Sequence, residues 1–332
     1  MQVNELFRQS NTILLDGGMG TMLQAAGLKL GARPEELNIT DPALIEGIHG
    51  QYAAAGSRIV NANTFGASAH KLAGSAYTLE QVITAGIENC KRACAPYGAL
   101  TALDVGPLGE LLEPSGTLAF EDAVAEYARI VKAGEAAGAD LIFFETYTDL
   151  YELKAALLAA KENTHLPILA SMSFEAGGRT FTGCTVESFA ATARGLGADA
   201  VGINCSLGPK EIFPMAKRLA EAVPGNFPVF VKPNAGLPRA DGSGYDITPQ
   251  LFALQMKPYR EMHLFAAGGC CGTTPEFIKL LNGTFAGCTP GRPAHRMPSV
   301  LCTPVDTVTV DGITVVGERI NPTGKKRFQQ AL

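Results

Sequence analysis

The sequence contains no tryptophan, and charged residues make up only 18% of its 332 residues. Without tryptophan, the side chain that best binds quaternary ammonium groups is missing, which argues against a choline-type ligand such as betaine. The formal net charge is -5, and basic residues cluster only in the short run 325–327. Because this charge offers no basic surface for nucleic acid, we expect no nucleic-acid partner.

Long apolar segments are also missing. The first residues contain no apolar stretch of the kind that a secretory signal requires, and the longest apolar runs are too short to span a bilayer. We therefore expect no membrane partner and a cytoplasmic, reducing location. In that location the eight cysteines are expected to be metal ligands, reactive thiols or buried core residues rather than disulfides.

What the sequence does contain is a repeated pattern of strands and helices. Hydrophobic residues amount to 46% and glycine to 37 residues, which suits a compact α/β enzyme with many tight turns. The predicted strands are 12–16, 58–61, 100–104, 140–145, 167–174, 200–204, 228–232 and 263–266. The predicted helices are 42–55, 79–95, 120–137, 150–162, 186–195, 210–223, 249–259 and 275–281.

Eight strand–helix units over about 275 residues predict a (β/α)₈ TIM barrel. The strands are nearly continuous apolar runs, as buried parallel strands are. An open doubly wound sheet is the alternative, but no Gly-x-Gly-x-x-Gly follows the first strand. Since barrel active sites lie at the C-terminal strand ends, the polar residues there should meet in one mouth. They are Asp16, Asn61, Asn63, Asp104, Glu145, Ser171, Ser173, Asn204, Cys205, Lys232, Asn234, Cys270 and Cys271.

The composition changes after residue 285. We expect the barrel to occupy 1–285 and residues 286–306, which are rich in proline and glycine, to form a linker. Residues 307–316 alternate around Asp311-Gly312, which predicts a hairpin centred on that pair. Residues 307–332 are then expected to be the incomplete start of a next domain.

Three cysteines carry the strongest chemical signal. Cys205 follows one predicted strand, and the glycine-flanked pair Cys270-Cys271 follows another. The glycines give the turn enough freedom for adjacent cysteines to reach one ion. Three thiolates can bind zinc and leave its fourth position open, as catalytic zinc sites do. A substrate thiol bound there would become a thiolate and stay nucleophilic, so the pattern predicts zinc-dependent S-alkylation.

The alternative for each cysteine is a small core residue. Cys90 and Cys94 share the apolar stripe of a predicted helix, and we assign no role to Cys184, Cys288 or Cys302. The spacing is not Cys-x-x-Cys, so neither a zinc ribbon nor a thioredoxin-type site fits.

Two carboxylates at strand ends indicate how a substrate is held. Asp16, followed by glycines, fits either a phosphate-binding turn or an amino-acid clamp, in which the carboxylate takes an α-amine and backbone N–H groups take a carboxylate. Glu145 is a second candidate of this kind, and the alternative for both is a structural salt bridge. Asn234 is a candidate for the open zinc position in the absence of substrate.

Together these motifs resemble the homocysteine S-methyltransferase family. The matching stretches are 15–21, 61–67, 144–146, 202–206, 232–236 and 268–275. The resemblance implies a zinc-dependent (β/α)₈ barrel that methylates homocysteine to methionine, with Cys205, Cys270 and Cys271 as zinc ligands. By the same likeness, the residues around the amino-acid end of homocysteine are Asp16, Gly17, Glu145, Thr146, Ser171 and Asn234.

The end of the chain bears on the methyl donor. Residues 315–324 are similar to the first strand and turn of the pterin-binding folate domain of cobalamin-dependent methionine synthases. This likeness implies that the chain is the N-terminal homocysteine-binding module of such an enzyme. Methylcobalamin would then be the donor, carried by a cobalamin-binding domain or a corrinoid protein, with a folate domain in the full-length enzyme.

Three alternatives stay open: a stand-alone enzyme using S-methylmethionine, a corrinoid-dependent methyltransferase for another thiol, and a non-enzymatic zinc scaffold or redox sensor.

Overall fold

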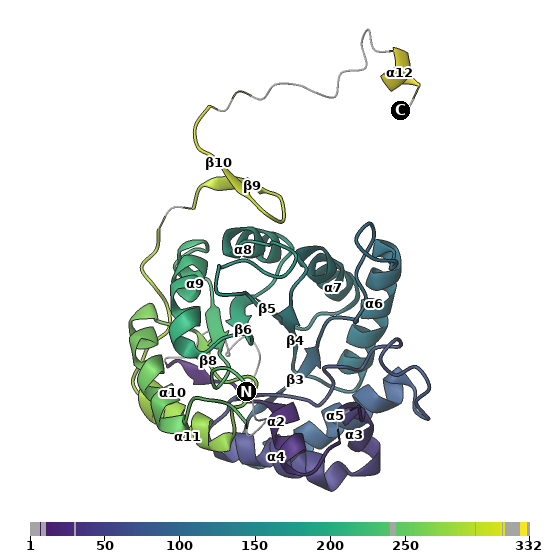
Figure 1. Cartoon of the computed structure of the whole chain (residues 1–332), viewed down its shortest axis with the longest axis vertical. Coiled ribbons are helices and arrows are strands. Elements are labelled where there is room, and N and C mark those ends of the chain that lie inside the picture. Colours follow the sequence, from purple (N-terminus) through teal and green to yellow (C-terminus); the bar gives the residue numbers. More distant parts are fainter. Residues whose placement is uncertain are drawn as a thin grey trace.

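The chain folds into a closed barrel of parallel strands. The computed structural model describes residues 7, 11–29, 31–239, 244–295, 297–313, 315 and 326–330. Its eight-stranded sheet has the order β1-β8-β7-β6-β5-β4-β3-β2. The two end strands, β1 (Ile13–Leu14) and β2 (Ile59–Asn61), are joined by a parallel bridge between Leu15 and Ile59. Figure 1 shows the helices surrounding the strands. The predicted (β/α)₈ barrel is confirmed.

The remaining barrel strands are β3 (Leu100–Val105), β4 (Leu141–Tyr147), β5 (Ile168–Met172), β6 (Ala200–Asn204), β7 (Val229–Lys232) and β8 (Ala266–Ala267). The longer helices are α4 (Pro42–Ala54), α5 (Leu79–Cys94), α6 (Phe120–Ala136), α7 (Leu150–Asn163), α8 (Val186–Gly195), α9 (Pro209–Glu221), α10 (Pro249–Met256) and α11 (Pro275–Phe285). The sequence reading missed two short helices after β1, namely α2 (Met19–Ala25) and α3 (Leu37–Thr40).

The last barrel strand was predicted too early. Residues 263–266 were expected to form it, but β8 is Ala266–Ala267. A 3-10 helix, η3 (Lys257–Met262), precedes it, and His263 ends that helix with a left-handed φ of 49°. A residue in this conformation cannot continue an extended strand.

Several helices begin at polar residues that cap their free N–H groups. Thr78 accepts from the backbone N–H of Gln81, and the Gln81 side chain accepts in return from Thr78, which forms a capping box at α5. At the start of α7 the Asp149 side chain accepts from the backbone N–H of Tyr151, and at the start of α8 the Thr185 side chain accepts from that of Ser188. These caps fix where the loops that follow the strands end, and those loops carry the site.

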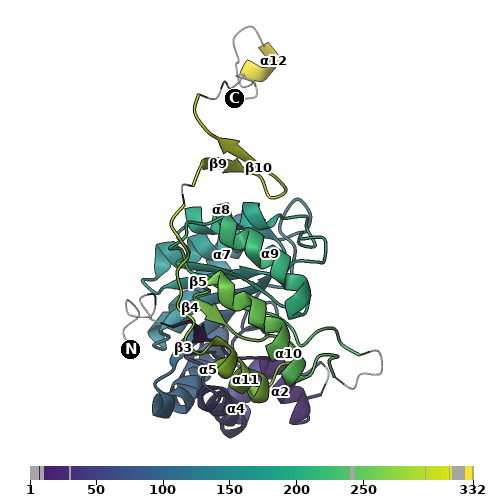
Figure 2. The ribbon, with the colours of Figure 1, turned by 90° about the vertical axis from the view of Figure 1, so that its left-hand side faces the viewer.

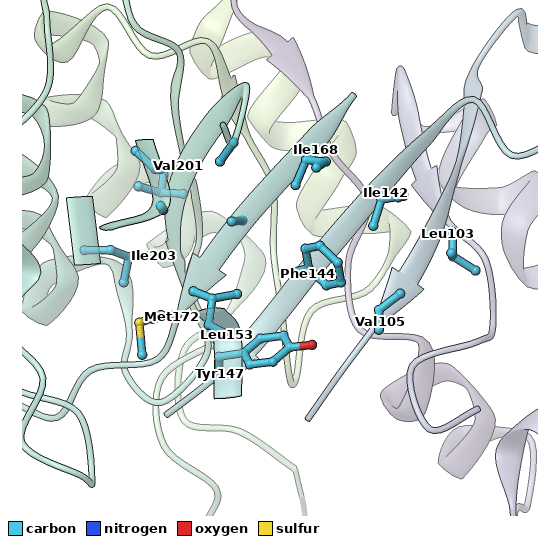
Figure 3. Packing of buried hydrophobic residues seen from close by; sticks show 14 of the residues in the cluster. Leu103, Val105, Ile142, Phe144, Tyr147, Leu153, Ile168, Met172, Val201 and Ile203 are labelled. Atoms are coloured by element: carbon cyan, nitrogen blue, oxygen red, sulfur yellow. The ribbon is translucent and has the colours of Figure 1, made fainter. Parts of the chain in front are cut away.

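The hydrophobic core has two parts, separated by the sheet. Alternate side chains along a strand point to opposite faces. One set, which includes Leu100 and Ala102 of β3, fills the inside of the barrel. The other set packs between strands and helices. Figure 3 shows that second layer, with Leu103, Val105, Ile142 and other side chains of the strands.

The inside of the barrel changes from apolar to polar within one layer of side chains. On six consecutive strands, the inward position that follows the last apolar one is polar. The six residues are Asn61, Asp104, Glu145, Ser171, Asn204 and Lys232, and all are buried. The polar layer lies at the C-terminal ends of the strands, where the predicted mouth is.

The C-terminal hairpin differs from its prediction. β10 (Thr307–Val310) pairs antiparallel with β9 (Ser299–Cys302), and the turn between them is closed by Thr303 and Asp306. Strand 307–310 thus pairs with the segment before it, and the described residues 311–313 and 315 form no strand, so the hairpin expected around Asp311-Gly312 is not seen in the described part of the chain. The predicted linker 286–306 includes β9.

The hairpin packs beside α8, where the backbone N–H of Thr185 donates to the carbonyl oxygen of Pro304 at 3.2 Å (Figure 2). Of the folate-like stretch 315–324, all but residue 315 lies outside the described residues. The boundary of a further domain at 307 stays a prediction. In the part of the chain that is described, none of the helices has both the length and the apolar character that crossing a bilayer requires.

Candidate active site

Three cysteine sulfurs meet at the C-terminal end of the barrel. The Sγ atoms of Cys205, Cys270 and Cys271 all lie within 4.8 Å of one another, and those of Cys205 and Cys271 are 3.8 Å apart. Two sulfurs bound tetrahedrally to zinc at about 2.3 Å are separated by about 3.8 Å. The donor set and its spacing therefore fit a zinc ion with three thiolate ligands.

The backbone around these cysteines is held in uncommon conformations. Cys205 and Ser206 both have a left-handed φ, of 61° and 60°, which costs about 1–2 kcal/mol per non-glycine residue. Gly272 has a φ of 79°, and a Cβ there would lie 2.3 Å from the ring of Tyr245, so only glycine fits. Such strain persists only where the surrounding structure imposes it. Here the carbonyl oxygens of Lys232 and Pro233 accept from the N–H groups of Cys205 and Cys270.

The three thiols cannot all ionise by themselves. The neighbouring thiols of Cys205 and Cys270 lower the pKa of Cys271 to about 3. The pKa of Cys205 is raised by the same two neighbours, Cys270 and Cys271, and by burial. For Cys270, a hydrogen bond with Cys205 lowers the pKa, but Cys271 and burial outweigh it and raise the pKa to about 11. One thiolate is favoured, and holding three requires a cation at their centre.

A buried lysine connects the carboxylates at the barrel centre. Lys232 Nζ lies 3.1 Å from Oδ1 of Asp16 and 2.9 Å from Oε2 of Glu145. Burial alone lowers the pKa of the Lys232 amine, but the two carboxylates raise it well above its usual value. Burial raises the pKa of Glu145 to about 7 and also raises that of Asp16, while Lys232 opposes both shifts. Because Lys232 keeps its proton, the geometry is that of an ion-paired cluster.

A cavity of about 330 Å³ lies between the cysteines and this cluster. Its lining includes Asp16, Gly17, Gly18, Met19, Glu35, Asn61, Asn63, Phe65, Asp104, Glu145, Thr146, Cys205, Lys232, Tyr245, Cys270 and Cys271. Four of the six residues expected around the amino-acid end of a substrate, Asp16, Gly17, Glu145 and Thr146, therefore share one cavity with the three cysteines.

The other two expected residues, Ser171 and Asn234, lie outside the cavity lining. Ser171 donates to Oδ1 of Asn204 at 2.9 Å, and that oxygen also accepts from the backbone N–H of Thr146 at 2.9 Å. Asn204 in turn donates to Oγ1 of Thr146 at 2.7 Å, which holds Thr146 at its left-handed φ of 67°. Ser171 thus contacts the site through Asn204. The Oδ1 atom of Asn234 is buried and has no hydrogen-bond partner among the described residues.

Sequence reasoning assigned no role to Lys232 or Tyr245, both of which line the cavity. Lys232 ends a strand at the same face of the barrel as the carboxylates of Asp16 and Glu145. An ion pair between the lysine and these carboxylates could have been expected from the sequence. Tyr245 belongs to the loop after β7 and packs on Gly272. No local pattern marks its contact, because it arises only when that loop folds back over the cysteines.

Several known proteins are similar to this chain in sequence or in fold. A sequence profile described as homocysteine S-methyltransferase matches residues 13–285. Methionine synthases of Mycobacterium tuberculosis and Mycobacterium leprae are each 32% identical over 96% of this chain, which spans 28% of their length. The structure of the homocysteine methyltransferase MmuM from Escherichia coli, in its oxidized form, is 23% identical with a TM-score of 0.73, covering 85% of this chain and 98% of that one. The chain belongs to the homocysteine S-methyltransferase family.

Proposed function

We propose that this chain transfers a methyl group to the thiol of homocysteine and so forms methionine, with zinc bound by Cys205, Cys270 and Cys271. The observation that carries the proposal is the meeting of three sulfurs, at zinc-like spacing, on a cavity of about 330 Å³ that the carboxylates of Asp16 and Glu145 also line. When bound, zinc would favour the thiolate form of a substrate thiol, and its three thiolate ligands would keep that sulfur electron-rich.

The chain's own residues orient the substrate. The cavity that holds the three cysteines is also lined by Asp16, Gly17, Glu145 and Thr146, and we assign these four residues to the amino-acid end of homocysteine. Lys232 holds the carboxylates of Asp16 and Glu145 in place. Tyr245 covers Gly272 beside the cysteines and narrows access for water. Reaction then needs a methyl group presented in line with the sulfur from the open end of the cavity.

We further propose methylcobalamin as the donor, carried by another domain or protein and, in a full-length enzyme, remethylated from methyltetrahydrofolate. The similarity to methionine synthases over 96% of this chain supports this choice. Exposed apolar side chains also lie on the loops that follow barrel strands: Phe65 after β2, Leu111 after β3, Phe181 after β5 and Leu237 after β7. A donor domain that docks over the mouth would cover such side chains.

The test is the visible spectrum of methylcobalamin mixed with zinc-loaded protein and homocysteine. We expect demethylation of the corrinoid that depends on both zinc and homocysteine, with one methionine formed per methyl lost. Protein with Cys271→Ser is the negative control. Methionine formed from S-methylmethionine instead would move the chain to the stand-alone class. Methylation of other thiols in preference to homocysteine would contradict the substrate assignment.

A further inference from the structure

Asn204 places a hydrogen-bond donor on one of the three cysteine sulfurs. Its Nδ2 atom lies 3.7 Å from Sγ of Cys270, and both side chains are buried. Cys270 is the most enclosed cysteine of the cluster, because Cys205 and Cys271 are partly exposed. Water approaches the other two sulfurs more easily, so the charge of a Cys270 thiolate depends more on protein groups for its stabilisation.

The orientation of the Asn204 amide follows from its partners. The backbone N–H of Thr146 can only donate, and it donates to Oδ1 at 2.9 Å. An amide turned over by half a rotation would set two N–H groups against each other at this contact. Oδ1 also accepts from Oγ of Ser171 at 2.9 Å, and Nδ2 donates to Oγ1 of Thr146 at 2.7 Å. The second Nδ2 hydrogen is therefore left for the sulfur of Cys270.

These contacts connect the cysteine cluster to three barrel strands. Asn204 ends β6, and its partners Ser171 and Thr146 belong to β5 and β4. Cys270 follows β8. Thr146 has a left-handed φ of 67°, which is an outlier for a β-branched residue and persists only where its surroundings impose it. Because two neighbouring strands hold the amide, the N–H group that faces Cys270 is held in place as well.

We propose that Asn204 is a positioning residue of the zinc site, which donates an N–H···S hydrogen bond to the Cys270 thiolate and fixes the place of this sulfur in the cluster. The inference rests on the proposed function, because it requires that the three cysteines bind the metal. A hydrogen bond draws negative charge from the sulfur, so Cys270 shares less charge with the metal than a free thiolate does. With less charge from Cys270, bound zinc would favour the thiolate form of a substrate thiol more strongly.

Cobalt(II) reports on this hydrogen bond, because thiolate-to-cobalt charge-transfer bands depend on the charge that each sulfur carries. The full chain is loaded with cobalt, and its near-ultraviolet spectrum is compared with those of Asn204→Ala and Asn204→Ser, whose side chains are too short to reach Cys270. We expect the bands to move to longer wavelength in both variants, because the sulfur regains the charge that the hydrogen bond withdrew. Zinc affinity, measured by competition with a chromophoric chelator, should fall by about 10-fold or more.

Ser171→Ala is the matched control, since it removes a hydrogen bond to the same amide but none to the sulfur. Its bands should keep the wild-type wavelength, and the distant Asn163→Ala, at the end of α7, should match wild type in both measurements. Unmoved bands in both Asn204 variants would overturn the proposal even if zinc affinity fell, because a merely structural role weakens the site without changing the charge on the sulfur.

A measurement on wild-type protein does not depend on whether a variant folds. With the metal replaced by an NMR-active cadmium isotope, an N–H proton that is hydrogen-bonded to a metal-bound sulfur couples to the cadmium nucleus. We expect this coupling for one side-chain proton of Asn204, and its absence would overturn the proposal by itself. Wild-type protein that binds neither zinc nor cobalt would refute the proposed metal site, which separates a failure of the proposed function from a failure of the role of Asn204.

Discussion

Lys232 donates from Nζ to Oε2 of Glu145 at 2.9 Å, and both side chains are buried. The two residues are 87 positions apart and come from strands on different sides of the barrel, β7 and β4. A buried ion pair contributes little net stability, because desolvation offsets the attraction. Replacing only one of the two residues is costly, however, because the other is left as a buried charge without its partner. The pair therefore fixes the geometry of the site rather than holding the barrel together.

Replacing Lys232 with Met should lower the free energy of unfolding by about 3–5 kcal/mol, because the carboxylates of Asp16 and Glu145 lose their common cation. Urea unfolding at pH 7.5 measures the change. Lys132→Met, an exposed change on α6, should stay within about 0.5 kcal/mol of wild type. Adding Asp16→Asn to Lys232→Met should recover part of the loss. Wild-type stability in the single variant would show that the carboxylates do not depend on this lysine.

Replacing Cys271 with Ser should weaken zinc binding by about 100-fold or more and abolish methyl transfer, because one of three sulfur ligands is lost. Metal analysis after dialysis against a chelator gives the zinc content. Cys302→Ser is the matched control, because Cys302 is exposed on β9 and outside the cavity lining. Full activity with no bound zinc in Cys271→Ser would refute the metal assignment.

Replacing Asn204 with Ala should destabilise the fold by about 2–4 kcal/mol, since Asn204 is fully buried and pairs with Thr146 and Ser171. Homocysteine affinity should also fall, because Thr146 loses the contacts that hold its left-handed backbone at the cavity wall. Urea unfolding and thiol calorimetry report the two effects. Asn163→Ala, at the end of a surface helix, should change neither, and unchanged homocysteine binding in Asn204→Ala would refute the link through Thr146.

The barrel and the cysteine cluster were predictable because local rules decide them. Apolar runs that end in polar residues, repeated eight times, specify parallel strands whose C-terminal ends share one face. Cys205 and Cys271 therefore meet although they are 66 residues apart. The barrel fold alone brings them together, so the contact could be predicted without knowing which residues pair.

The pairing of the carboxylates was not predictable in this way. Asp16, Asp104 and Glu145 look equivalent in the sequence, as each follows an apolar strand. Lys232 forms hydrogen bonds with Asp16 and Glu145 across the barrel, and Asp16 is 216 residues away in the sequence. Among the described residues, it forms none with Asp104. The position of the C-terminal hairpin was not predicted, for a related reason. Asp311-Gly312 is a strong local turn signal, but strand 307–310 found its partner at 299–302, in a segment whose composition indicated a linker.

The stability of the protein should fall below pH 6.5 in a way that depends on His49. This side chain on α4 is fully buried, and neither ring nitrogen has a hydrogen-bond partner in the described part of the chain. Burial lowers its pKa to about 3. An unfolded histidine has a pKa of about 6.5, so the unfolded chain binds more protons between these values and stability is lost as the pH falls. At pH 4.5 the loss from this group is about 3 kcal/mol. Between pH 7.5 and 4.5, the free energy of unfolding of His49→Leu should therefore rise by about that much relative to that of wild type, as measured by urea unfolding. The contributions of the carboxylates cancel in this comparison. The exposed His165→Leu should gain nothing. A difference between His49→Leu and wild type that stays constant across this range would show that His49 is already protonated in the folded protein.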